Sequence, residues 1–303
     1  MANLRDIRRR IKSVKNTSQI TRAMQLVAAS KMKRAQDQAL HGRPFAITLN
    51  RVINRLKERV DMDDPHPLLA EHGGGGKELV VVVNSDKGLC GGLNTNMLKA
   101  LLADVGEDAD YVTVGKKLAK SLARLKKNLV AEFSIPDPIG FGECKVISHF
   151  ITEKFLAGEY SRVKVAFTNF VNTLRQVPTV ETLLPISVVA LGDKEDFAGM
   201  GQDKKWEAAE AEVKPLSDAG YIYEPTPGEV FSHALPMYIN YQFYQMVLEA
   251  RASEHSARMV AMKSATDNAN QLAKDLTLEY NKVRQAAITN ELLEITTAMK
   301  ALE

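Results

Sequence analysis

The sequence predicts an α/β fold in which long helices at the two ends of the chain flank an inserted domain of alternating strands and helices. Three observations support this prediction. The final 67 residues, 237–303, contain neither glycine nor proline. Residues 4–14 carry apolar side chains at helical spacing. Between the ends, short apolar strands alternate with helical segments, which is typical of a largely parallel sheet.

The N-terminal region, residues 1–60, is predicted to be helical from residue 2 or 3 at least as far as His41. Its apolar side chains repeat at intervals of three and four residues, the spacing of a coiled-coil seam: Leu4, Ile7, Ile11 and Val14. Gly42 and Pro44 predict a kink or short break, because proline removes a backbone donor and glycine weakens a helix. Residues 47–60 then resume helical periodicity.

The C-terminal region, residues 229–303, is predicted to be a very long helix. At about 1.5 Å per residue, its 67 residues without a helix breaker would form a rod of roughly 100 Å. Its apolar side chains again follow a seam: Ala269, Leu272, Leu276, Val283 and Ala286, then Ile288, Leu292, Ile295, Met299 and Leu302. Two seams at opposite ends of one chain are expected to pair as an antiparallel coiled coil. A homodimeric coiled coil is the alternative.

Between the helical ends, the chain is predicted to form one α/β domain over residues 79–191. The polar, Pro/Gly-punctuated stretch 61–78 precedes it as a linker, and the polar stretch 192–228 follows it. The expected strands are 79–83, 111–115 and 162–170. The expected helices are 93–105, 116–127 and 144–158.

Cysteine content and hydropathy exclude several classes of protein. The chain has two cysteines, Cys90 and Cys144, which argues against a disulfide scaffold and indicates a reducing compartment. No stretch approaches the roughly 20 apolar residues of a membrane span, and the N-terminus lacks a signal-peptide pattern. The protein is therefore expected to be soluble, or peripheral if it meets a membrane.

The charge is strongly polarised along the chain. Residues 1–43 hold eleven Lys/Arg and two acidic residues, a net charge of +9, whereas the other 260 residues carry −6. Basic side chains point in nearly every direction around this helix: Arg8, Arg9, Arg10, Lys12 and Lys15. This pattern predicts an acidic partner. Nucleic acid is one candidate, although no long zipper follows the basic region and no aromatic residues are interleaved with it.

The glycine-rich segment SDKGLCGGLN, residues 85–94, follows the first strand and is a candidate phosphate loop. It has no lysine after its glycines, as a P-loop needs, and its spacing does not fit the dinucleotide motif GxGxxG. It is predicted to be a tight turn that presents Lys87 and Cys90 outward; a looser anion-binding nest is left open. The six histidines show no ligand or triad spacing, so neither a metal site nor a catalytic Cys90 is predicted.

Three stretches of the chain resemble the γ subunit of F-type ATP synthases: residues 7–36, 85–97 and 253–295. The resemblance extends over essentially the whole chain. It implies that the terminal helices form an antiparallel coiled coil inside a hexamer of α and β subunits, and that a Rossmann-like domain meets the c-ring and the ε subunit. One copy is expected per complex. The β subunits hold the nucleotide, so no catalytic site, cofactor or metal is expected here.

The resemblance also implies a set of contact residues. Arg258 and Gln285 are expected to hydrogen-bond a loop of a β subunit, and Met24 to face the β subunits. The complete set expected to contact a β subunit is Met24, Lys87, Cys90, Arg258, Gln285, Thr289, Glu291 and Glu294. The turn with Lys87 and Cys90 is expected to approach the acidic lower lip of a β subunit. The set expected to contact the c-ring is Tyr221, Tyr223 and Glu224.

The sequence departs from the family in two places. Ala298 and Met299 stand where the family's C-terminal signature has Gly-Ala, so the end of the helix is expected to pack differently. Residues 192–220 fall where plant chloroplast relatives carry a regulatory cysteine pair, but contain no cysteine. With no transit peptide either, we expect a bacterial protein, peripheral on the cytoplasmic face of the inner membrane. A nucleic-acid-binding coiled-coil protein and a nucleotide enzyme are the alternative functions.

Overall fold

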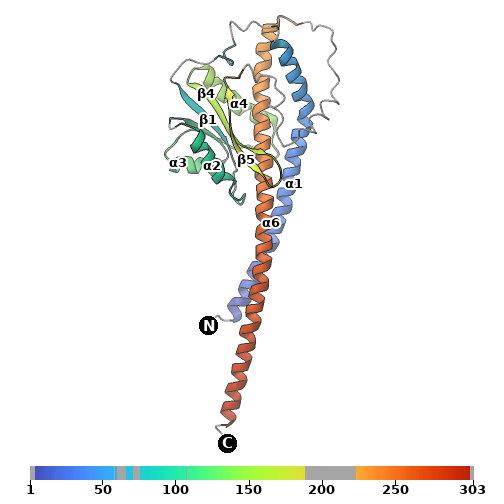
Figure 1. Ribbon diagram of the computed structural model, residues 1–303, viewed down its shortest axis with the longest axis vertical. Coiled ribbons are helices and arrows are strands. Elements are labelled where there is room, and N and C mark those ends of the chain that lie inside the picture. Colours follow the sequence, from blue (N-terminus) through green and yellow to red (C-terminus); the bar gives the residue numbers. More distant parts are fainter. Residues whose placement is uncertain are drawn as a thin grey trace. The chain divides into compact units, whose positions relative to one another are not determined.

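The computed structural model describes residues 4–57, 59, 66–70, 76–106, 108–187 and 223–300 (Figure 1). The chain divides into two compact units. The terminal unit comprises Met1–Ala28 and Met259–Glu303, and the α/β unit comprises Ala29–Arg258. Two long helices contribute residues to both units: α1, Leu4–Lys57, and α6, Pro227–Lys300.

In the terminal unit, α1 and α6 run antiparallel, as predicted. The Ser18 hydroxyl donates a hydrogen bond to the side-chain oxygen of Asn270 at 2.7 Å. The hydroxyls of Thr21 and Thr266 are also 2.7 Å apart. A step forward along α1 therefore corresponds to a step backward along α6, which defines the antiparallel direction. The seam closes within one chain.

The seam is lined largely by small side chains. On α1, Ile7, Ser18 and Ala28 are buried; on α6, Met262, Thr266, Ala269 and Ala273 are buried. Small residues let two helix axes approach closely. The predicted seam is confirmed at Ala269 but wrong at Leu272, which is 48% exposed. The seam follows alanine and threonine instead, a signal that apolar spacing alone does not reveal.

In the α/β unit, α1 passes through Gly42 and Pro44 without interruption, so of the predicted kink or short break, the break is wrong. Contacts from α6 support this stretch. The Tyr241 hydroxyl donates to the Gly42 carbonyl oxygen at 2.6 Å, and the rings of Phe45 and Tyr241 have centroids 5.0 Å apart. Tertiary packing thus outweighs the low helix propensity of glycine and proline.

The sheet has five strands in the order β3-β2-β1-β4-β5. Four are mutually parallel: β1 Lys77–Val83, β2 Asp110–Val114, β3 Asn128–Phe133 and β4 Tyr160–Phe170. The fifth, β5 Gln176–Leu184, is antiparallel to β4. The predicted strands correspond to β1, β2 and β4. The two that sequence reasoning missed are the edge strands, most of whose side chains are only partly buried or exposed, and β5 includes Pro178.

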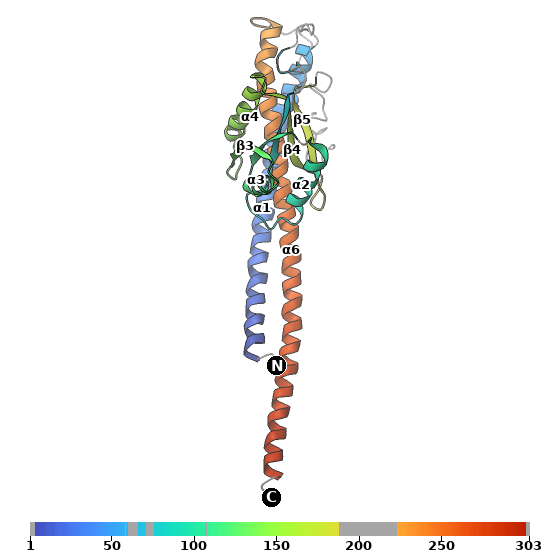
Figure 2. The ribbon, with the colours of Figure 1, turned by 90° about the vertical axis from the view of Figure 1, so that its left-hand side faces the viewer.

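Helices cover both faces of the sheet (Figure 1 and Figure 2). On one face, Val80 and Val82 pack in a core with residues of α2, Leu93–Asp104, and α3, Lys116–Arg124. On the other, Val81 and Val83 share a larger core with α4, Phe141–Leu156, and with the parts of α1 and α6 that belong to this unit. The three predicted domain helices are thus confirmed, and the sheet is a largely parallel, doubly covered one.

The two predicted polar connections lie mostly outside the described residues, as does Tyr221. One part of the predicted linker is described and belongs to the core. Leu68 is 1% exposed, and its carbonyl oxygen accepts a hydrogen bond from the Ile186 amide at 2.9 Å. Within the part of the chain that the structure describes, no helix is both long and apolar enough to cross a membrane.

Candidate partner-contact sites

The C-terminal part of α6 exposes a row of apolar side chains. The offset between the two seam hydrogen bonds places the described start of α1 opposite roughly residue 284 of α6. Residues beyond that point were predicted to continue the seam; this is wrong for the described ones, and Leu302 lies outside them. Ile288, Leu292, Ile295 and Met299 are between 49% and 64% exposed. We call these four residues the apolar stripe. Apolar side chains left in water over several helical turns mark a site of interaction with another chain.

Polar side chains expected to contact a β subunit lie on the same part of α6. Gln285 and Thr289 are exposed and one turn apart, and the Thr289 hydroxyl donates to the Gln285 carbonyl oxygen at 3.0 Å. That bond uses the backbone carbonyl of Gln285, so the side-chain amide of Gln285 is available to a partner. Glu291 and Glu294 are also exposed. The helix therefore presents apolar, amide and carboxylate groups along one exposed segment.

Met24 lies on α1 in the terminal unit and is half-buried. Nearby apolar side chains of the same helix are exposed: Ile20 at 61%, Leu26 at 64% and Val27 at 54%. Like the apolar stripe, they indicate a surface that another chain covers.

The turn between β1 and α2 is tight, as predicted, and two of its residues have positive φ. These are Leu89 at 64° and Gly91 at 59°. Lys87 is exposed, as expected. The prediction that Cys90 faces outward is wrong, because Cys90 is 2% exposed. Its Sγ lies 3.4 Å from the side-chain amide nitrogen of Asn94, so the turn folds the thiol inward against the start of α2.

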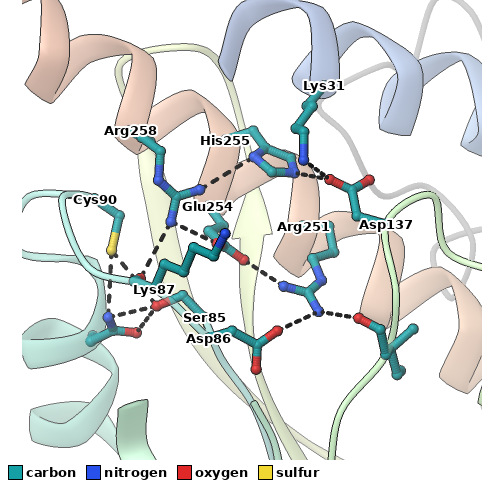
Figure 3. Close-up of polar contacts among 12 residues, drawn as sticks. Lys31, Ser85, Asp86, Lys87, Cys90, Asp137, Arg251, Glu254, His255 and Arg258 are labelled. Carbon is teal, nitrogen blue, oxygen red and sulfur yellow. Dashed lines mark hydrogen bonds and ion pairs between the residues drawn. The ribbon is translucent and has the colours of Figure 1, made fainter. Parts of the chain in front are cut away.

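Arg258 does not point freely outward either, since its side chain is only 12% exposed. Its Nη2 donates to Glu254 Oε1 at 2.8 Å and lies 3.3 Å from the carbonyl oxygens of both Lys87 and Gly88. Its Nε lies 3.4 Å from the Gly88 oxygen. Figure 3 shows the guanidinium directed at the turn after β1. The guanidinium is therefore engaged within its own chain.

A second arginine of α6 binds the same carboxylate from the other side. Arg251 Nη1 donates to Glu254 Oε2 at 2.9 Å, and Arg251 Nη2 donates to the Ile135 carbonyl oxygen at 3.0 Å. Arg251 Nη2 also lies 3.5 Å from Asp86 Oδ2. Burial lowers the pKa of Arg251, but Glu254 and Asp86 raise it, and the net shift is upward. The carboxylates of Glu254 and Asp86 are thus each paired with a guanidinium group.

His255 connects Arg258 to α1. Its Nδ1 lies 3.3 Å from Arg258 Nη1, and its Nε2 lies 3.4 Å from Asp137 Oδ2, which in turn lies 2.7 Å from Lys31 Nζ. Arginine can only donate, so Nδ1 accepts and the proton of the neutral ring is on Nε2. Burial is the main cause that lowers the pKa of His255, with Arg258 and Lys31 adding to it against Glu254 and Asp137.

These seven residues form what we call the arginine cluster: Lys31, Asp86, Asp137, Arg251, Glu254, His255 and Arg258 (Figure 3). Sequence reasoning identified Arg258 alone. Residues 251, 254, 255 and 258 are spaced by three, one and three, which places four polar side chains on one helical face. The spacing of these four polar residues was the available signal.

Of the residues expected to meet the c-ring, the structure describes Tyr223 and Glu224. The guanidinium carbon of Arg59 lies 5.5 Å from the centroid of the Tyr223 ring, a cation–π contact. Glu224 is exposed. In the described ranges, no three His, Cys, Asp or Glu side chains gather in a way that could hold a metal ion.

Comparison with known proteins gives consistent results. The sequence model of the family described as ATP synthase matches residues 3–302 of this chain. The ATP synthase gamma chain of Akkermansia muciniphila is 51% identical over 303 residues, and 100% of each chain is covered. That of Opitutus terrae is 47% identical over 305 residues, with 99% of each chain covered. In a cryo-EM structure of the Euglena gracilis mitochondrial ATP synthase rotor, one chain shares this fold with a TM-score of 0.59 and 18% identity, covering 94% of this chain and 98% of that chain.

Proposed function

This chain belongs to the ATP synthase γ-chain family, and from that premise we propose that it is the central rotor stalk of an F-type ATP synthase. The observation that carries the proposal is the apolar stripe of α6. Ile288, Leu292, Ile295 and Met299 have no counterpart on α1 to cover them within the described residues. A surrounding ring of α and β subunits would cover such a helix on every side.

The proposed stalk acts by shape and contact. An asymmetric shaft touches three catalytic subunits differently, so each subunit favours a different conformation, and rotation exchanges these preferences in turn. Ion flow through the c-ring would drive that rotation. The nucleotide chemistry belongs to the β subunits, and this chain supplies no catalytic site of its own.

The proposed contacts to a β subunit divide by unit. In the terminal unit, Met24 faces the β subunits, and Gln285, Thr289, Glu291 and Glu294 supply polar contacts. A charge at Met24, as in Met24→Lys, would disturb coupling. In the α/β unit, Lys87 approaches the acidic lower lip of a β subunit.

The α/β unit is proposed to meet the membrane sector. Tyr221, Tyr223 and Glu224 would contact the c-ring, and the ε subunit would bind beside them. One copy of the chain serves each complex, which lies peripherally on the cytoplasmic face of a bacterial inner membrane. The basic face of α1, whose Arg8, Arg9 and Arg10 are exposed, would face acidic groups of the hexamer rather than nucleic acid.

Co-assembly tests this function directly. The purified chain is mixed with purified α and β subunits from the same organism, and the product is separated by size and tested for ATPase activity. We expect a complex with one copy of this chain and an ATPase activity that the α and β subunits lack without it. Tight binding to duplex DNA at physiological salt, with no association with α and β subunits, would contradict the proposal.

A further inference from the structure

Arg258 has its hydrogen-bonding capacity largely used within its own chain. A guanidinium has five N–H donors. Those of Arg258 are directed at Glu254, at His255 and at the carbonyl oxygens of Lys87 and Gly88, at distances of 2.8 to 3.4 Å. A direct bond to another subunit would require some of these contacts to break. Breaking a charge-assisted hydrogen bond in a nearly buried site is costly.

Two of these acceptors are backbone carbonyls of the turn that carries the exposed side chain of Lys87. The Lys87 carbonyl belongs to the Lys87–Gly88 peptide bond and the Gly88 carbonyl to the next one, and Arg251 contacts the carboxylate of the preceding residue, Asp86. Three consecutive residues of the turn are therefore held by two arginines of α6, while the side chain of Lys87 remains exposed. A charged side chain on a fixed turn loses less conformational entropy on binding than one on a mobile turn.

The remaining members of the arginine cluster orient Arg258. Glu254 lies between the two guanidinium groups and accepts from both. His255 accepts from Arg258 through Nδ1, and its Nε2–H is directed at Asp137, which Lys31 also contacts. The planar guanidinium can serve a carboxylate, an imidazole and two carbonyls together, which a lysine ammonium cannot.

We propose that Arg258 is a positioning residue that fixes the turn Asp86–Gly88 to α6 and so holds Lys87 in position to contact its partner. Arg258 does not itself bond the neighbouring subunit. Glu254 is the hub that orients Arg258 and Arg251 together. The role of Lys87 as the contact rests on the proposed function. The fixing of the turn does not.

The first test uses the full chain alone, with no partner present. Limited trypsin digestion, followed by mass spectrometry, gives the rate of cleavage of the Lys87–Gly88 bond relative to the Arg175–Gln176 bond in the exposed turn between β4 and β5. Cleavage requires local opening. Arg258→Gln should raise the relative rate about tenfold, because it removes charge-assisted bonds to both carbonyls. Arg258→Lys should recover less than half of the protection, because an ammonium lacks the planar fork.

Two further variants make this test decisive. Glu254→Gln keeps the side-chain volume and should raise the relative rate about threefold, so it decides the question if Arg258→Gln does not fold. Arg124→Gln changes an exposed arginine on α3 of the same unit and should leave the rate unchanged. An unchanged rate in both Arg258→Gln and Glu254→Gln would overturn the proposal.

The second test uses the complex assembled with α and β subunits, and asks whether Arg258 acts through Lys87. Lys87→Gln and Arg258→Gln should each lower the ATPase activity of this complex about threefold, and the double variant should be no worse than Lys87→Gln alone. If the two effects are independent, the double variant should lower the activity about ninefold. That result would overturn the proposal and indicate that Arg258 contacts the partner directly. Failure to assemble would contradict the proposed function alone, and the digestion of the free chain would still decide the role of Arg258.

Discussion

The hydroxyl of Ser18 donates a hydrogen bond to the side-chain oxygen of Asn270, 252 residues away in the sequence, at 2.7 Å. This bond and the contact between Thr21 and Thr266 fix the register of the two helices of the terminal unit. Both lie in a seam of small side chains, where a hydroxyl must find a partner because water has little access. The register in turn leaves the last turns of α6 without a counterpart on α1.

Removing the seam hydroxyl should weaken the terminal unit. Ser18 is 8% exposed, so Ser18→Ala should lower the free energy of unfolding by about 1 kcal/mol, because it loses a hydrogen bond made in a nearly buried site. Urea unfolding followed by circular dichroism measures the difference. Ser13→Ala, at an exposed position of the same helix, is the matched control. Equal stability of the two variants would mean that the seam bond contributes nothing.

Two glycine substitutions should have opposite effects. An added Cβ at Gly42 would lie 2.5 Å from the Tyr241 hydroxyl oxygen, so Gly42→Ala must displace the side chain that supports α1 at Pro44. We expect a loss of about 1–2 kcal/mol in the free energy of unfolding. At Gly142 in α4, nothing lies within 4 Å of the added Cβ, so Gly142→Ala should stabilise by about 0.5–1 kcal/mol. Thermal unfolding of both variants distinguishes them, and stabilisation by Gly42→Ala would show that Tyr241 is not tightly held.

A buried carboxyl should make stability depend on pH. Burial, with a smaller effect of Glu181, raises the pKa of Glu249 to about 8. A raised folded-state pKa means that the protonated form is favoured in the fold, so stability is greatest below the unfolded value and is lost as pH rises towards and through about 8. Glu249→Gln should remove this loss, on the order of a few kcal/mol between pH 5 and pH 9.

Urea unfolding across this pH range measures the effect of Glu249. Glu132→Gln, at an exposed position of β3, is the control and should retain the pH dependence of the unchanged protein. If the Glu249→Gln variant lost stability with pH as steeply as the control, another group would be responsible for the dependence.

The apolar stripe should matter to assembly and not to the chain by itself. Leu292 is 58% exposed, so Leu292→Lys should change the stability of the free chain by less than about 0.5 kcal/mol. In the presence of α and β subunits it should weaken assembly at least about tenfold, because a charge would be buried. Leu174→Lys, at an 82% exposed leucine of the α/β unit, should leave assembly unchanged. Titration of complex formation by native mass spectrometry provides the comparison, and equal affinities for the two variants would rule out burial of the stripe.

Much of the fold could be predicted from local patterns. The absence of glycine and proline after Pro236 predicted α6, and apolar runs predicted the three strands buried in the middle of the sheet. The edge strands β3 and β5 were missed because an edge strand buries little, so its apolar signal is weak. The seam was misplaced at Leu272 because the two helices pack through alanine, serine and threonine.

The candidate sites depend more on tertiary contacts, which sequence does not reveal. Lys87 was correctly expected on the surface, whereas the burial of Cys90 follows from a turn that folds back on α2. Arg258 was identified by resemblance, but its internal bonds require the turn after β1 to lie against α6, a contact between residues 170 positions apart. Glu254 and Asp86 gain their significance only from that contact.

Rotation of the chain inside an assembled complex tests the central claim most directly. A probe is attached to an exposed position of the α/β unit, the α and β subunits are immobilised, and the probe is observed by single-molecule microscopy while ATP is hydrolysed. The proposed function predicts ATP-dependent rotation in one direction, in three equal steps per turn, one for each β subunit. A probe that stays fixed on an assembled complex that hydrolyses ATP would contradict it.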